Sequence, residues 1–209
     1  REQPIQDVSH PAIAVNLESC IQCTRCVRAC REEQMNDVIG LAFRGAHSQI
    51  VFDLGDDMGA SSCVGCGECV QACPTGALMP KTHIGNQVVD RQVDSVCPFC
   101  GVGCLLTYNI QDEKIISVDG RNGPANQSRL CVKGRFGFDY VHHQQRLIKP
   151  LVRIPGVKKD INTKANPDDW KDVFRETSWD EVLDRIGSQF KSLKDDYGHK
   201  VLAGFGSAK

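Results

Sequence analysis

Two short apolar segments separated by a glycine stand out in the first third of the chain. They cover positions 39–43 and 49–54, with Gly45 between them and Gly55 after the second. Short apolar runs bounded by glycine are typical of strands, and these two predict either separate strands or a hairpin.

A second pair of apolar segments covers 105–110 and 114–118. Asp112 and Glu113 stand between them where a turn is needed, so we expect a second hairpin here. The polar segment 81–92, which lies between the two predicted hairpins, is typical of a linker.

The pattern changes from strand to helix near the end of the chain. Ser178 and Glu181 have the spacing of a capping box, which predicts a helix from there to Tyr197 with Gly198 as its stop. The apolar residues of this segment recur at helical spacing, so we expect one face of the helix to pack against another part of the protein. That face consists of Val182, Leu183, Ile186, Phe190, Leu193 and Tyr197.

The last residues have the pattern of the beginning of a larger domain. The segment 201–205 is mostly apolar and leads into a glycine-containing turn, which predicts a buried strand. No second strand follows that could pair with it in an α/β sheet before Lys209. We therefore expect an α/β domain to continue beyond Lys209.

Composition and charge argue against several classes of protein. With 41% hydrophobic and 24% charged residues, the chain is globular rather than disordered. A formal net charge of -1 without a basic run makes nucleic acid an unsuitable partner. No apolar stretch is long enough to span a membrane and no signal peptide is evident, so we expect no membrane partner and a cytoplasmic location.

Cysteine is the strongest chemical signal in the sequence. All 12 cysteines lie between positions 20 and 131, and in a cytoplasmic chain this density indicates bound metal rather than disulfides. Eight of them form two matching runs. Three cysteines at three-residue intervals followed by a fourth suit the wrapping loop of a 4Fe-4S cluster. The runs are Cys20-x2-Cys23-x2-Cys26-x3-Cys30 and Cys63-x2-Cys66-x2-Cys69-x3-Cys73-Pro74.

The last cysteine of each run is predicted to serve the other cluster, as it does in ferredoxins with two clusters. Zinc is the alternative, although zinc sites usually take two separated cysteine pairs. The predicted ligand sets are Cys20, Cys23, Cys26 and Cys73 for the first cluster, and Cys63, Cys66, Cys69 and Cys30 for the second.

The remaining four cysteines form a third group with three close members and one remote member. By the same argument they predict a third 4Fe-4S cluster, with zinc again as the alternative. The predicted ligands are Cys97, Cys100, Cys104 and Cys131.

Two stretches of the chain resemble known families. Residues 13–80, with CIQCTRCVRACRE and CVGCGECVQACPTGALMP, resemble the double-cluster segment shared by iron-only hydrogenases and cytosolic formate dehydrogenases. Residues 96–153, with VCPFCGVGC and LCVKGRFGFDYVHHQQRLIKPLVR, resemble the N-terminal cluster domain of molybdopterin-dependent oxidoreductases, most closely formate dehydrogenase catalytic subunits. The stretches TSWDEVLDRI and VLAGFGSAK are similar to the start of the large domain of that family.

The resemblance implies an α+β chain in three parts. A ferredoxin-like domain with two 4Fe-4S clusters and a linker would cover 1–90, and a small β-rich 4Fe-4S domain would cover 91–150. The start of a large α/β molybdopterin-binding domain would cover 151–209. The family also carries a lysine between its last cluster and the pterin, and Lys133 matches that lysine by position.

The implied activity of the intact protein is oxidation of formate to carbon dioxide at a molybdenum or tungsten bis-molybdopterin guanine dinucleotide. The clusters would pass electrons to a flavin and iron-sulfur partner subunit that reduces NAD. The residues that bind formate and the metal lie further along in the family, so no catalytic residue is predicted in this chain. Three alternatives stay open: another molybdopterin oxidoreductase such as a nitrate reductase, a stand-alone polyferredoxin that only carries electrons, and an interaction module held together by zinc.

Overall fold

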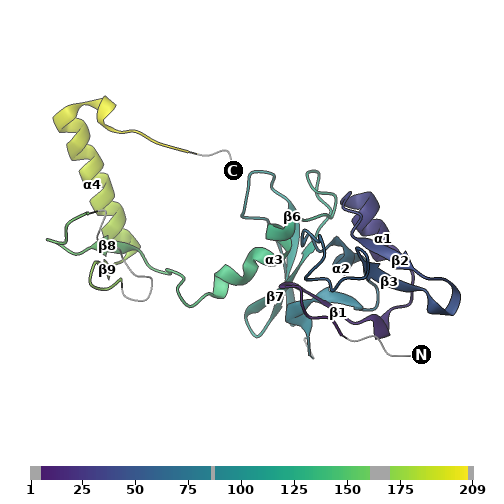
Figure 1. Ribbon diagram of the computed structural model, residues 1–209. Helices are drawn as coiled ribbons and strands as arrows, with labels where there is room; N and C mark the ends of the chain where they lie inside the picture. The colour runs from purple at the N-terminus through teal and green to yellow at the C-terminus, as the bar shows by residue number, and fades with distance from the viewer. Residues whose placement is uncertain (1–5, 86–87, 161–169, 207–209) are drawn as a thin grey trace. The chain divides into compact units, whose positions relative to one another are not determined.

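The computed structural model describes residues 6–85, 88–160 and 170–206. The chain divides into two compact units, Arg1–Asp139 and Tyr140–Ala208. Each unit has its own strands and helices, which are labelled in Figure 1.

The first predicted hairpin is confirmed. Strands β2 (Ile39–Ala42) and β3 (Gln49–Phe52) pair antiparallel, with Ile39 opposite Phe52. The 3-10 turn η3 (Gly45–His47) connects them, as the glycine between the two apolar segments suggested.

A second strand pair joins two segments that are distant in sequence. Strand β1 (Ile13–Val15) pairs antiparallel with β4 (Leu78–Pro80), which follows the second cysteine run. The short 3-10 turns η1 (Leu17–Ser19) and η4 (Lys81–His83) continue from these strands. The two ends of the ferredoxin-like region are thereby held together.

Two short helices carry cysteines into the core of this region. Helix α1 (Arg25–Arg28) continues into a π-helical turn, η2 (Ala29–Glu33), and contacts α2 (Glu68–Ala72). The buried cysteines therefore lie among the apolar side chains that stabilise the fold. This core contains Ile13, Val15, Cys26, Cys30, Val38, Ile39, Ile50, Phe52, Met58, Cys69 and Leu78.

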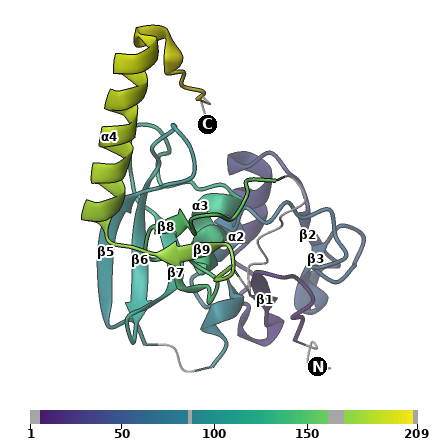
Figure 2. The ribbon, with the colours of Figure 1, turned by 90° about the vertical axis from the view of Figure 1, so that its left-hand side faces the viewer.

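The first unit also contains a three-stranded antiparallel sheet, and Figure 2 shows its strands side by side. Its order is β5 (Arg91–Val96), β6 (Leu105–Gln111) and β7 (Lys114–Gly120). The second predicted hairpin, β6–β7, is confirmed, and its turn residues Asp112 and Glu113 have φ of 48° and 59°. The sequence did not predict β5, which begins inside the segment interpreted as a linker.

Helix α3 (Val132–Phe136) packs on strand β7 and leads into the 3-10 helix η5 (Gly137–His142). Between the sheet and these helices lies a second apolar core, which also contains a cysteine. Its buried members are Cys97, Leu106, Val118, Leu130 and Phe138.

The second unit contains the long helix that the capping signal predicted. Helix α4 (Trp179–Tyr197) begins after Ser178, whose Oγ accepts a hydrogen bond of 3.1 Å from the Glu181 N–H, and it ends at Gly198. Only half of the capping box forms, because the Glu181 carboxylate binds Arg175 and Thr177 instead of the backbone at Ser178. No helix of the described ranges has the length and apolar character needed to cross a membrane.

Two predictions for this unit are wrong. The segment 201–205 forms no strand: it follows the 3-10 turn η6 (His199–Val201), and Phe205 is 99% exposed. The predicted packing face of α4 is not buried, since Phe190 is 53% exposed and no residue of the helix is buried. A strand requires a hydrogen-bonding partner, and the strand pair described in this unit, β8 (Leu151–Arg153) with β9 (Phe174–Glu176), does not extend to these residues.

Candidate iron-sulfur centres

The first cysteine run forms a tight loop before helix α1. Gln22 and Thr24 both have left-handed backbones, with φ of 55° and 57°. Within the loop, the Gln22 N–H donates to Cys20 Sγ at 3.4 Å. The Gln22 side chain also donates to the carbonyl of Ser48, which ties the loop to the hairpin β2–β3.

The second run repeats this backbone with glycines. Gly65 and Gly67 have φ of 66° and 76°, and helix α2 begins directly after them. The Gly65 N–H lies 3.3 Å from Cys63 Sγ, the equivalent of the contact in the first run. In the first run, each left-handed non-glycine residue costs about 1 kcal/mol or more. The conformational preferences of these residues therefore do not explain the loop shape that the two runs share, and the rest of the site must stabilise it.

The structure brings cysteines of both runs close to one another. The pKa of the Cys26 thiol is raised to about 11, chiefly by burial and further by the charges of Cys20, Cys73 and Cys23. Cys73, the last cysteine of the second run, therefore lies beside the first run.

The second site shows the reciprocal arrangement. Burial raises the pKa of the Cys69 thiol well above its usual range, and the neighbouring charges of Cys66, Cys63, Cys26 and Cys30 raise it further. Cys30 also raises the pKa of Cys63, after burial. The last cysteine of the first run thus lies beside the second run.

The remote ligands of both sites receive backbone hydrogen bonds at sulfur. Burial alone would raise the pKa of Cys73, but the N–H groups of Leu78, Thr75 and Ala77, together with the Thr75 hydroxyl, outweigh it and lower this pKa. The Val38 N–H lies 3.4 Å from Cys30 Sγ. Donors of this kind favour the thiolate, the form that ligates iron.

The third group is assembled between the sheet and α3. Burial raises the pKa of Cys104, and the charges of Cys97, Cys100 and Cys131 raise it further, so these four thiols are neighbours. The Cys97 N–H donates to the Cys104 carbonyl at 2.8 Å, which closes the loop, and Cys131 directly precedes α3 at its N-cap position.

Each of the three groups brings four cysteines close together. All twelve cysteines are free thiols. Within the described ranges, no group of three or more His, Cys, Asp or Glu side chains is arranged to hold one metal ion. The thiolates around a cubane stand further apart than those around zinc, because iron and sulfide separate them. The assignment of each cysteine to a cluster stays a prediction.

Comparison with known families decides what kind of domains these are. Residues 10–79 match the family described as NADH-quinone oxidoreductase subunit 3, ferredoxin-like domain. Residues 90–143 match the molybdopterin oxidoreductase Fe4S4 domain. The chain carries both iron-sulfur domains. The resemblance of these two stretches to iron-sulfur domains is confirmed. The division of the chain at 90 and 150, and the start of a large domain after 150, stay predictions.

Relatives of the whole chain carry names from one enzyme class. "Putative formate dehydrogenase YrhE" of Bacillus subtilis (strain 168) is 30% identical over 97% of this chain and 23% of its own length. "Putative formate dehydrogenase SH0748" of Staphylococcus haemolyticus (strain JCSC1435) is 28% identical over 100% of this chain and 24% of its own length. The chain thus spans about a quarter of the length of these curated relatives.

One solved structure shows a partial likeness. A chain of NAD+-reducing NiFe-hydrogenase in the H2-reduced state is 26% identical, with a TM-score of 0.38 over 43% of this chain and 38% of that chain. A score this low does not establish a shared fold.

Within the Fe4S4 domain, Lys133 lies on α3 two residues after Cys131 and is exposed. Its side chain is therefore available to a group outside the described residues. The role predicted from the family resemblance, between the cluster and a pterin, stays a prediction.

His10 has no companion cysteines at ligand spacing, so the sequence indicates an ordinary loop histidine, but the structure buries it. It is 7% exposed, and its Nδ1 accepts N–H groups of Ala12 and Ile13, each at 3.1 Å. The ring proton must then sit on Nε2. An ideal Cβ on Gly65 would lie 3.8 Å from this Nε2, so the ring packs on the loop of the second run.

His10 is expected to make the protein less stable in mild acid. Burial, assisted by the charge of Lys81 and opposed by Asp7, lowers the pKa of His10. The unfolded state then binds more protons than the folded state below about pH 6.5, so stability falls as the pH drops through that value toward the lowered pKa. Anaerobic denaturant unfolding between pH 7.5 and 5.5 measures this loss.

The control for this prediction is an exposed histidine. His10→Asn is expected to cost about 1 kcal/mol at neutral pH, because one backbone N–H loses its acceptor, and to flatten the acid dependence. His47→Asn, at an exposed turn position, should keep the original dependence. Equal pH profiles for the two variants would contradict the assignment to His10.

Proposed function

We propose that this chain is the electron-transfer portion of the catalytic subunit of an NAD-linked formate dehydrogenase. In this proposal, the intact protein is a cytoplasmic oxidoreductase that converts formate to carbon dioxide at a molybdenum or tungsten bis-molybdopterin guanine dinucleotide. Residues 151–209 are then the start of the domain that binds this cofactor, and Lys133 is the residue of the Fe4S4 domain closest to it.

The observation that carries the proposal is the gathering of twelve free cysteines into three groups of four within one compact unit. The matched Fe4S4 domain belongs to molybdopterin oxidoreductases, and the two relatives described above carry the name "Putative formate dehydrogenase", which supports formate as the substrate.

The residues of this chain would bind three clusters and control their surroundings. A 4Fe-4S cluster supplies one-electron transfer at a potential set by hydrogen bonds, charge and solvent. Backbone N–H groups at Cys20, Cys63 and Cys30 lie in position to donate to ligated sulfur. Burial of Cys26, Cys69 and Cys97 keeps water from one side of each site.

The proposed electron path begins at the site of Cys97, Cys100, Cys104 and Cys131 and continues through the two sites of the ferredoxin-like domain. From there the electrons pass to a partner subunit with flavin and iron-sulfur groups, which reduces NAD. The third site is placed first because the family resemblance puts its cluster beside the pterin.

The full-length protein, prepared without oxygen, provides the test of the activity. We expect formate to reduce a viologen dye in its presence, and NAD to be reduced when the partner subunit is added. Nitrate-dependent oxidation of the reduced dye, without formate activity, would instead identify a nitrate reductase. Neither activity in a protein of full iron content would support the polyferredoxin alternative.

Metal analysis tests the cluster assignment separately from the activity. Three 4Fe-4S clusters require about twelve iron and twelve acid-labile sulfide per chain. Zinc at about three per chain without sulfide would overturn the assignment, because zinc sites contain no sulfide.

A further inference from the structure

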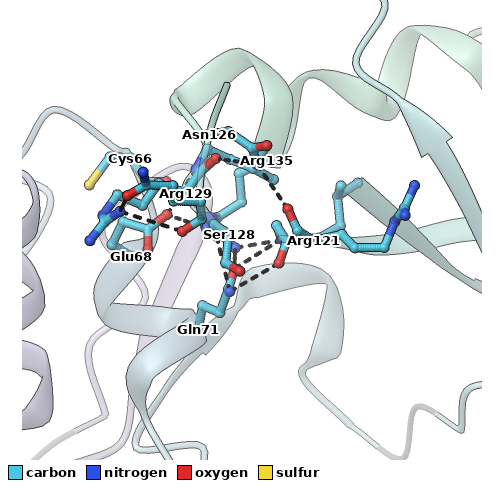
Figure 3. Close-up of polar contacts among 12 residues, drawn as sticks. Cys66, Glu68, Gln71, Arg121, Asn126, Ser128, Arg129 and Arg135 are labelled. Carbon is cyan, nitrogen blue, oxygen red and sulfur yellow. Dashed lines mark hydrogen bonds and ion pairs between the residues drawn. The ribbon is translucent and has the colours of Figure 1, made fainter. Parts of the chain in front are cut away.

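An ion pair lies buried between the two iron-sulfur domains. Arg135 of α3 is 2% exposed and Glu68 of α2 is 8% exposed, and Arg135 Nη2 lies 2.5 Å from Glu68 Oε1. Figure 3 shows Glu68 and Gln71 of α2 facing Arg135. The other ion pairs among the described residues lie in more exposed positions.

Both members of the pair also contact the backbone beside cluster ligands. Arg135 Nε donates to the carbonyl of Cys66 at 3.0 Å. Glu68 Oε1 accepts the N–H of Leu130, the residue before Cys131, at 3.0 Å. The pair therefore links the ligand loop of the second site to the segment that carries the last ligand of the third site.

Gln71 forms further hydrogen bonds between the two iron-sulfur domains. Its Oε1 accepts from Arg135 Nη1 at 2.8 Å and from the Gly120 N–H at 3.0 Å. Its Nε2 donates to the carbonyl of Ser128 at 3.2 Å. Arg135 Nη1 also reaches the carbonyl of Val118 at 3.4 Å. The guanidinium is thus held by contacts in both domains, and its position is fixed.

A buried ion pair is a poor source of stability, because desolvation offsets much of its attraction. Its charges act strongly on their surroundings, however, because solvent does not screen them. Both charges lie close to the second site, since Arg135 Nε donates to the carbonyl of Cys66 and Glu68 directly precedes Cys69.

We propose that Arg135 and Glu68 form a positioning pair that fixes the second and third cluster sites relative to each other and balances the charge at the second cluster. This inference rests on the proposed function in that it requires clusters at both sites. The cysteines of the two sites would hold clusters that exchange one electron, the third being oxidised as the second is reduced. The charges that Arg135 and Glu68 place near the second site would then affect how readily a cluster there accepts that electron.

The decisive variant is Glu68→Gln. Glutamine keeps an oxygen that can accept from Arg135 and Leu130, but it leaves the positive charge of Arg135 uncompensated. Potentiometric titration of the full chain with dithionite, followed by electron paramagnetic resonance, is expected to show the second cluster reduced at a higher potential than in the wild type. Glu113→Gln is the matched control, because Glu113 pairs with Arg91 at the surface and both side chains are exposed; no shift is expected.

The double variant Glu68→Gln/Arg135→Gln distinguishes the effect of charge on the reduction potential of the second cluster from the effect of altered packing. It removes both charges, so the potential should return toward the wild-type value, although the interface is further disturbed. A purely structural role for Glu68 predicts no such reversal. An unchanged potential in Glu68→Gln, or a double variant shifted as far as the single variant, overturns the charge part of the proposal.

Arg135→Lys tests whether the pair fixes the two cluster sites relative to each other. It also replaces Glu68→Gln as the test if the Glu68→Gln protein does not bind its clusters. Lysine keeps the charge but cannot reach Cys66, Gln71 and Glu68 together. We expect the potential to stay near that of the Glu113→Gln control, while the magnetic coupling between the reduced second and third clusters weakens. Unaltered coupling overturns the positioning part. If iron and sulfide analysis finds no clusters in the wild-type protein, the proposed function itself is refuted. That outcome is thereby distinguished from a failure of the positioning pair alone.

Discussion

Replacing Cys73 by alanine is expected to remove the cluster of the first cysteine run and to leave the cluster of its own run in place. Cys73 lies beside Cys26, where its charge contributes to the raised pKa of that thiol. The cluster of Cys63, Cys66 and Cys69 is expected to keep its fourth ligand, Cys30. Loss of one cluster lowers the iron content from about twelve to about eight per chain.

Paired substitutions identify which cluster is lost. In Cys20→Ala/Cys73→Ala both changes fall on the first predicted site, so about eight iron should remain, as in either single variant. In Cys63→Ala/Cys73→Ala the changes fall on two sites, and only about four iron should remain. Iron and acid-labile sulfide are measured on protein purified without oxygen.

The opposite ranking would contradict the crossed assignment. If Cys20→Ala/Cys73→Ala kept about four iron while Cys63→Ala/Cys73→Ala kept about eight, each run would hold its own cluster. Cys100→Ala is the control, because it belongs to the third predicted site and should remove about four iron from any of these variants.

The cysteine groups were predictable because their signal is local in the sequence. Ligands at three-residue intervals describe a loop that wraps one body, and the structure folds both runs into that loop. The glycines of the second run carried a further signal that was not used. Gly65 and Gly67 occupy the two left-handed positions, and aligning the runs places Gln22 and Thr24 at the same positions. The backbone of the first loop could therefore have been predicted from the second.

The two hairpins were predictable for a similar reason, since their apolar runs and turns are adjacent. Strand β5 was not, because nearly all of its residues are exposed and its pattern resembles a polar linker. For the segment 201–205 the error was the opposite one, because a strand was predicted and none forms. Its apolar residues suit a strand, but pattern alone does not supply the neighbouring strand whose hydrogen bonds it needs.

Contacts between distant residues were beyond the reach of sequence reasoning. Glu68 and Arg135 are 67 positions apart, and each resembles an ordinary surface charge in the sequence. The burial of His10 likewise depends on the loop of the second run, which follows more than fifty residues later. These residues surround the predicted ligands, so the sequence predicted the metal chemistry but not the surroundings that would tune it.

Gly67→Ala is expected to separate the two domains at the buried ion pair. An added Cβ would lie 2.0 Å from Arg135 Cδ and 2.9 Å from Phe136 Cε2, and Gly67 has a left-handed φ of +76°. Arg135 cannot move aside without breaking its bonds to Cys66, Glu68 and Gln71. Breaking a buried ion pair costs about 3–5 kcal/mol, in addition to about 1–2 kcal/mol for the left-handed alanine.

Gly45→Ala isolates the backbone cost of the same substitution. Gly45 has a φ of +62°, and no atom lies within 4 Å of its added Cβ, so only the left-handed alanine opposes folding. We expect a loss of about 1–2 kcal/mol there, and a loss several kcal/mol larger for Gly67→Ala. Anaerobic denaturant unfolding of the cluster-loaded chain measures both, and iron analysis shows whether the clusters remain. Equal losses for the two variants would mean that Arg135 can give way, and that its contacts do not hold the domains together.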